Sequence, residues 1–71
     1  MERTPVESSN LVSVGYDEQA RVLEIEFGGQ SVYQYFDVPK WLYEELMAAP
    51  SLGEYLDKHV KKGGYRYVRV E

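Results

Sequence analysis

The chain contains no cysteine and only one histidine among its 71 residues. Without cysteine, no disulfide can reinforce the fold, and the common thiolate zinc sites are excluded. No apolar run approaches the roughly 20 residues that a transmembrane helix needs. The first residues also lack the apolar stretch of a signal peptide. We therefore expect a cytoplasmic protein with no membrane association and no metal or other cofactor.

The chain is short enough that we expect a single domain spanning residues 1–71. A domain of this size buries only about 60% of its unfolded surface, so its core must be thin. Residues 1–7 are mostly polar and contain Pro5, and we expect them to be a loosely ordered lead-in.

Charge is distributed unevenly along the chain, whose net charge is −4. Residues 1–57 contain three basic and eleven acidic side chains, whereas residues 58–71 contain five basic side chains and one acidic one. A uniformly acidic protein would repel nucleic acid, but this chain joins a basic end to an acidic body. The alternative is that the basic end is an ordinary solvated surface.

Alternating apolar and polar residues predict strands in the first half of the chain. The clearest alternation places Leu23, Ile25 and Phe27 on one face of a half-buried strand. Gly28-Gly29 follows and can supply the positive φ of a tight hairpin turn. The pattern predicts strands over residues 11–16, 21–27 and 31–36.

Two helices are predicted after these strands. Pro39 suits the first turn of a helix, with Asp37 near enough to help cap it, and Pro50 ends it. Ser51 and Glu54 then fit a capping box at the start of a second, amphipathic helix. Gly63-Gly64 ends that helix, and residues 65–70 predict a last strand.

The resulting fold class is α+β, in the order β-β-β-α-α-β. We expect a small antiparallel sheet with two helices packed on one face. The predicted core consists of the apolar residues Leu23, Ile25, Phe27, Leu42, Leu46, Leu52, Leu56 and Val60.

The orientation of Tyr33 and Tyr35 depends on the length of the hairpin loop. A two-residue turn would put Gln34 on the core face and both tyrosines outside. A three-residue loop ending at Gln30 would put both tyrosines in the core, with Gln34 outside opposite Glu24. A one-residue slip in register flips every side chain. We favour the three-residue loop because it avoids burying an unpaired amide. The last strand has the same ambiguity.

Catalytic chemistry is not indicated, and we expect the protein not to be an enzyme. His59 lies on the apolar stripe of the second helix, which favours a partly buried structural role. No nucleophile is spaced to pair with it. Gly28-Gly29 lacks the Lys-Ser/Thr that a phosphate-binding loop requires, and Gly63-Gly64 precedes a strand.

Binding of single-stranded nucleic acid is the chemistry that the residues best support. Such binding needs aromatic faces for stacking and cations for phosphates. The alternative is that a small core uses these aromatic residues for packing. The candidate residues are Lys58, Lys61, Lys62, Arg66, Arg69, Tyr33, Tyr35, Tyr65 and Tyr67.

The order and spacing of several short motifs resemble the KTSC domain, a bacterial module also found at the C-terminus of some lysyl-tRNA synthetases. The resemblance covers the chain from about residue 6 to residue 70. It rests on Tyr33-x-Tyr35, Val38-Pro39, Ala49-x-Ser51-x-Gly53-x-Tyr55, the C-terminal Tyr65 and Tyr67, the early Ser8-Ser9 and the Tyr16-Asp17 turn. The family has no established activity, and its link to a synthetase implies RNA binding by analogy of domain context alone.

These observations support two hypotheses. The first is a non-enzymatic accessory module that binds RNA or single-stranded nucleic acid through its basic, aromatic C-terminal segment. The second is a protein-interaction module that uses an exposed edge strand or its divided charge, with self-association as one form of it. We expect the chain itself to be a monomer.

Overall fold

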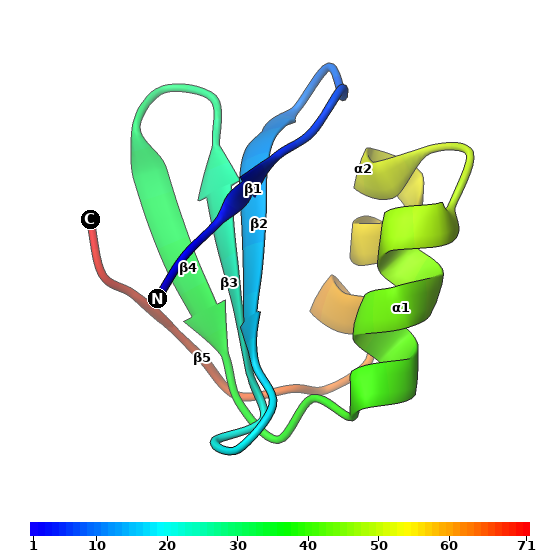
Figure 1. Ribbon diagram of the computed structural model, residues 1–71. Helices are drawn as coiled ribbons and strands as arrows, with labels where there is room; N and C mark the ends of the chain where they lie inside the picture. The colour runs from blue at the N-terminus through cyan, green and yellow to red at the C-terminus, as the bar shows by residue number, and fades with distance from the viewer.

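The computed structural model describes all 71 residues and consists of a five-stranded antiparallel sheet with the helices on one face (Figure 1). The strands are β1 (Thr4–Pro5), β2 (Leu11–Asp17), β3 (Val22–Phe27), β4 (Ser31–Tyr35) and β5 (Tyr67–Arg69). The helical segments are α1 (Lys40–Ala48), α2 (Leu52–Tyr55) and the π-helical turn η1 (Leu56–Lys61). The order across the sheet is β1-β2-β3-β4-β5, with every neighbouring pair antiparallel.

The α+β prediction is confirmed, with one additional strand at the start. Thr4 pairs with Val14 and Pro5 with Ser13, so β1 lies at an edge of the sheet. Proline is tolerated there because an edge strand does not need every backbone N–H. A strand of two residues is too short to show alternation of apolar and polar residues. The polar character of residues 1–7 and the presence of Pro5 therefore indicate only a loosely ordered lead-in.

The β3–β4 hairpin has the three-residue loop, as predicted. Phe27 pairs with Ser31 across the loop, and positive φ occurs at Gly29 (88°) and Gln30 (70°). Tyr33 therefore pairs with Ile25 and lies on the face that the helices cover. The opposite, open face carries Glu24 and its partner Gln34.

The core lies between the sheet and the helices. Six of the eight predicted core residues are buried, and Phe27 and Leu52 are partly buried against the same cluster. The predicted core omits Leu11 and Val14 of β2 and Val38 before α1, whereas Tyr35 is buried as the favoured three-residue loop predicts. The buried cluster consists of Leu11, Val14, Leu23, Ile25, Tyr35, Val38, Leu42, Leu46, Leu56 and Val60.

The two helix starts differ in their capping. Pro39 is the N-cap of α1 and no side chain caps it, so the prediction that Asp37 helps to cap this helix is wrong. Asp37 instead has a positive φ of 59° in the turn before the helix. The Ser51 cap is confirmed, because its side chain accepts a hydrogen bond of 3.3 Å from the Glu54 N–H. No helix has both the length and the apolar character to span a membrane.

The second helix continues from α2 into η1, where Leu56 and Val60 face the core. Its end depends on Gly63, whose N–H donates to the Val60 carbonyl at 3.2 Å. A Cβ at Gly63 would lie against the His59 carbonyl oxygen, closer than real Cβ contacts allow. Gly64 follows with φ of 81°. After this tight turn the chain continues to β5.

We predict that Gly63→Ala lowers the free energy of unfolding by about 1–3 kcal/mol, because the added methyl group must displace backbone. Urea unfolding followed by circular dichroism measures this loss. Gly28→Ala is the matched control. The nearest atom to its Cβ would be 3.9 Å away and its φ is not positive. Equal losses in the two variants would contradict this account of the turn.

Candidate nucleic-acid interface

Three aromatic rings form a continuous cluster where β3, β4 and β5 lie side by side. The Tyr33 ring meets Phe27 edge-on, with centroids 5.7 Å apart and planes at 82°. On its other side it meets Tyr67, at 6.0 Å and 46°. The pairing of Tyr35 with Tyr67 and of Tyr33 with Arg69 places these side chains on one face of the sheet. That face carries a row of rings ending at the β5 edge.

Exposure separates the tyrosines that can contact a ligand from those that cannot. Tyr67 is 59% exposed and Tyr33 is partly buried, so both present ring surface to solvent. Tyr35 is only 3% exposed, and its burial, reinforced by Tyr33 and Tyr67, raises the pKa of its phenol to about 12. Tyr35 is therefore a core residue and cannot serve as a stacking surface.

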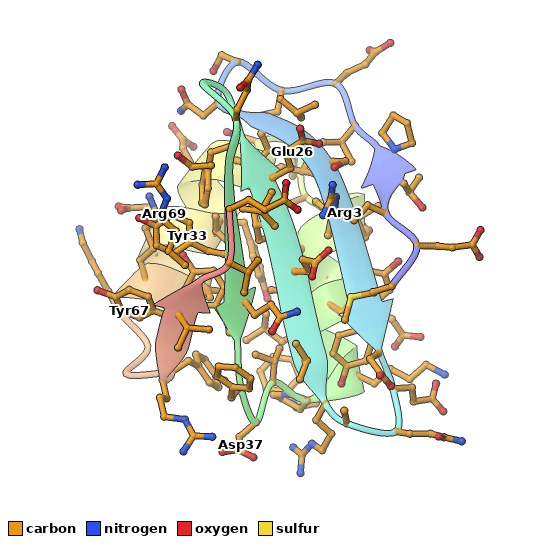
Figure 2. The ribbon with its side chains drawn as sticks, turned by 90° about the vertical axis from the view of Figure 1, so that its left-hand side faces the viewer. Arg3, Glu26, Tyr33, Asp37, Tyr67 and Arg69 are labelled. Atoms are coloured by element: carbon orange, nitrogen blue, oxygen red, sulfur yellow. The ribbon has the colours of Figure 1, made fainter.

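Two cations border the aromatic row. The Lys61 Nζ lies 4.9 Å from the centre of the Phe27 ring, a cation–π distance. Arg69 pairs with Tyr33 across the strands, and its Nε donates to the Glu71 carbonyl at 2.8 Å. Figure 2 shows Tyr33, Tyr67 and Arg69 together along the β5 edge of the sheet. We call the set Phe27, Tyr33, Lys61, Tyr67 and Arg69 the edge patch.

The other predicted cations lie outside the edge patch. The Arg66 guanidinium packs 5.0 Å from the Phe36 ring centre, and the Lys62 Nζ lies 3.4 Å from an Asp57 carboxylate oxygen. Lys58 borders a separate hollow beside Pro50. Tyr65 is half-buried close to the Gly63 turn. The structure thus brings together four of the nine predicted residues: Tyr33, Lys61, Tyr67 and Arg69.

Phe27 was assigned to the core and was missed as a member of the site. It follows the same alternation as Leu23 and Ile25, so the sequence pattern predicts burial. Its position beside the glycine loop, at the end of the strand, leaves the ring only partly covered. The hairpin register is the signal that could have identified Phe27. With a three-residue loop, Phe27 pairs with Ser31 and so lies near Tyr33.

Polar side chains cover the open face of the sheet, and the residue that links them is Arg3. Its Nη1 donates to a Glu24 carboxylate oxygen at 2.6 Å, and its Nε donates to the Ser13 hydroxyl at 3.0 Å. Ser13 donates in turn to Glu26 at 2.7 Å, and the Gln34 amide donates to Glu24 at 2.8 Å. Figure 2 shows Arg3 and Glu26 on this face, away from the edge patch. Arg3 is 21 residues from Glu24, so no local pattern could predict their contact.

Glu24 is a nearly buried carboxylate, only 7% exposed. Burial alone would raise its pKa, but hydrogen bonds from Gln34 and Arg3, together with the positive charge of Arg3, outweigh it and lower the pKa. Because the folded state lowers the pKa, this carboxylate stabilises the fold above its unfolded pKa of about 4.3. The contribution is lost as the pH falls through the folded pKa.

His59 is exposed, so the prediction of a partly buried histidine is wrong. Its ring packs on Tyr55, with centroids 4.3 Å apart. The Tyr55 hydroxyl donates a hydrogen bond of 2.7 Å to Glu45. Burial and this hydrogen bond raise the pKa of the Tyr55 phenol to about 12. No group of three or more His, Cys, Asp or Glu side chains is placed to hold a metal ion.

The model of the KTSC domain family matches residues 7–67, which is most of the chain. The chain belongs to the KTSC domain family. The crystal structure of a KTSC domain protein from Yersinia pestis superposes with a TM-score of 0.91 and 40% sequence identity. The match covers 99% of this chain and 97% of that one. The family resemblance found in the sequence is therefore confirmed.

The curated relatives include a protein that matches over its full length and ligases that match over a small part of theirs. An uncharacterised protein from Stutzerimonas stutzeri is 38% identical over the full length of both chains. A lysine–tRNA ligase from Trichormus variabilis is 41% identical over 64 residues, which cover 90% of this chain and 11% of the ligase. A ligase from Nostoc punctiforme is 40% identical over the same shares. The KTSC domain thus corresponds to a small part of these ligases.

We predict that Arg3→Met destabilises this KTSC domain by about 1–3 kcal/mol near pH 7, because Glu24 stays buried without its cationic partner. The pKa of Glu24 then rises. The difference from the unmodified chain should shrink as the pH falls through the lowered pKa of Glu24 in the unmodified chain, because the carboxylate then becomes protonated in both proteins. Urea unfolding measured across this pH range tests both statements.

Lys40→Met is the control for this prediction. Its ion pair with Glu18 is also short, at 2.7 Å, but both side chains are more than half exposed. Solvent screening makes such pairs weak, so stability should hardly change. A pH-independent loss in Arg3→Met, or an equal loss in both variants, would contradict the role of Arg3.

Proposed function

We propose that this KTSC domain is a non-enzymatic accessory module that binds single-stranded nucleic acid, RNA in particular, through the edge patch. The observation that carries the proposal is the row of three rings, Phe27, Tyr33 and Tyr67, bordered by Lys61 and Arg69. Successive bases of a single strand stack on such rings while cations hold the phosphates. The other predicted residues are not part of the proposed interface: Tyr35, Lys58, Lys62, Tyr65 and Arg66.

The division of charge supports this choice of ligand. Five of the eight basic residues lie between positions 58 and 71, whereas eleven of the twelve acidic residues lie before position 58. An acidic body and a basic edge would orient a polyanion toward the edge patch and repel it elsewhere. The open face, with Glu24 and Glu26, would not accept phosphates.

The relatives give independent support. Several lysine–tRNA ligases contain a segment about 40% identical to this chain. By their name these ligases act on a tRNA, and a domain within them that contacts RNA would serve that activity. We extend RNA binding to the present chain as part of the proposal.

We predict that Lys61→Gln combined with Arg69→Gln weakens binding of a single-stranded RNA at least tenfold at low salt. Each phosphate contact on a single strand contributes about −0.7 to the slope of log K against log salt, so the slope should become shallower by about 1.4. Tyr67→Ala should weaken binding about tenfold through lost stacking, with little change in slope. Fluorescence anisotropy across a salt series measures both quantities.

The matched control is Lys58→Gln combined with Arg66→Gln. It removes the same charge from the same segment but from outside the edge patch. Affinity and slope should change much less than in the first pair. Equal effects of the two pairs would reject the edge patch as the interface, and a flat salt response of the unmodified chain would reject nucleic-acid binding through phosphates altogether.

A protein-interaction module is the second candidate, favoured by one observation. Val68 and Val70 lie at the sheet edge and are 43% and 44% exposed. A partner strand could pair with β5 and cover them. Sedimentation over a concentration series tests the self-associating form, which a monomer at every concentration would exclude.

A further inference from the structure

A cleft of about 420 Å³ opens between the β3–β4 hairpin and the second helix. The strand side contributes the start of β2 and the end of β3, and the helix side contributes one face of α2 and η1. The residues that matter for its chemistry are Asn10, Phe27, Gly28, Gly53, Asp57 and Lys61. A hydrogen bond of 3.0 Å from the Gly28 N–H to the Asn10 carbonyl joins the two strand segments at its wall.

The cleft is continuous with the edge patch. Phe27 and Lys61 belong to both, and the Phe27 ring is in contact with Tyr33. A strand that stacks on Tyr67 and then on Tyr33 therefore arrives at the mouth of the cleft. Lys61 is exposed and can hold the phosphate at that point.

Gly53 keeps one wall of the cleft bare. Its backbone does not have the positive φ that would require glycine, and glycine is less favourable than alanine within a helix. A Cβ at this position would lie 3.3 Å from the Asn10 amide nitrogen. The absence of a side chain at Gly53 leaves Asn10 reachable from the cleft.

The polar groups of the cleft suit the edge of a nucleobase. Asp57 is an acceptor only, whereas the Asn10 amide can both donate and accept. The ion pair of Asp57 with Lys62 joins two side chains that are 54% and 74% exposed, so it is weak and easily displaced. The carboxylate is therefore available to a ligand that offers N–H donors.

We infer that the cleft takes one base of the bound strand and selects guanine through Asp57. The Watson–Crick edge of guanine presents two adjacent N–H donors, which match the two oxygens of a carboxylate. Uracil presents one N–H between two carbonyl oxygens, which the carboxylate repels. This inference rests on the proposed function, because the base reaches the cleft from the edge patch.

The test compares two single-stranded RNAs about ten nucleotides long, within the site sizes of small single-strand-binding domains. One contains only uridine, and the other carries a single central guanosine. We expect the guanosine to tighten binding about tenfold, within the discrimination that a bidentate contact supplies. Asp57→Asn should abolish that ratio, and Gly53→Leu should abolish it by filling the cleft.

Glu54→Gln is the matched control for Asp57→Asn, since it removes one negative charge from the same helix outside the cleft. It should leave the ratio of the two affinities unchanged. A ratio near one in the unmodified chain, or a ratio retained in Asp57→Asn, overturns the assignment of the cleft. The proposed function then still stands if the all-uridine strand binds and responds to Lys61→Gln with Arg69→Gln. Failure of both strands to bind overturns the two together.

Discussion

The pairing of Ile25 with Tyr33 across the β3–β4 hairpin is the constraint on which the rest of this domain depends. It follows from the three-residue loop, where Gly29 and Gln30 adopt positive φ. A register one residue away would turn Gln34 toward the helices and leave Glu24 on the open face without its present partner. In the observed register, Tyr35 fills the core and Tyr33 reaches the edge with part of its ring exposed.

The two faces of the sheet are stabilised by different interactions. The helix side buries the aliphatic core, which is thin because the chain is short. The open face has no second layer, and a polar network organised by Arg3 covers its centre. That network also ties down β1, a strand of only two residues. The first residues of the chain are thus held by backbone pairing with β2 and by Arg3 with its buried carboxylate partner.

The sequence predicted most of the fold, because alternation, glycine turns and helix caps are local signals. The hairpin register followed from the cost of burying Gln34, and the Ser51 cap from its spacing to Glu54. The prediction failed where long-range contacts decide: β1 depends on pairing with β2, and Arg3 depends on Glu24. Asp37 was expected to cap α1, but its backbone turns away from the capping position.

The candidate site was predicted only in part for the same reason. Basic residues close in sequence are expected to act together, but Lys58 borders a different hollow, Lys62 pairs with Asp57, and Arg66 packs on Phe36. Lys61 joins the edge patch because its side chain reaches back to Phe27. The result is a smaller site than composition indicates, with two cations beside three rings and a polar cleft at one end.

The most direct test of this account is an amide NMR titration of the chain with mixed single-stranded RNA at low and moderate salt. The account predicts shifts at Phe27, Tyr33 and residues 61–69, all of which weaken as salt is added. The open-face residues Arg3 and Glu24 should not shift. Shifts centred on the open face, or none at about 1 mM RNA, far above ordinary non-specific dissociation constants, would contradict it.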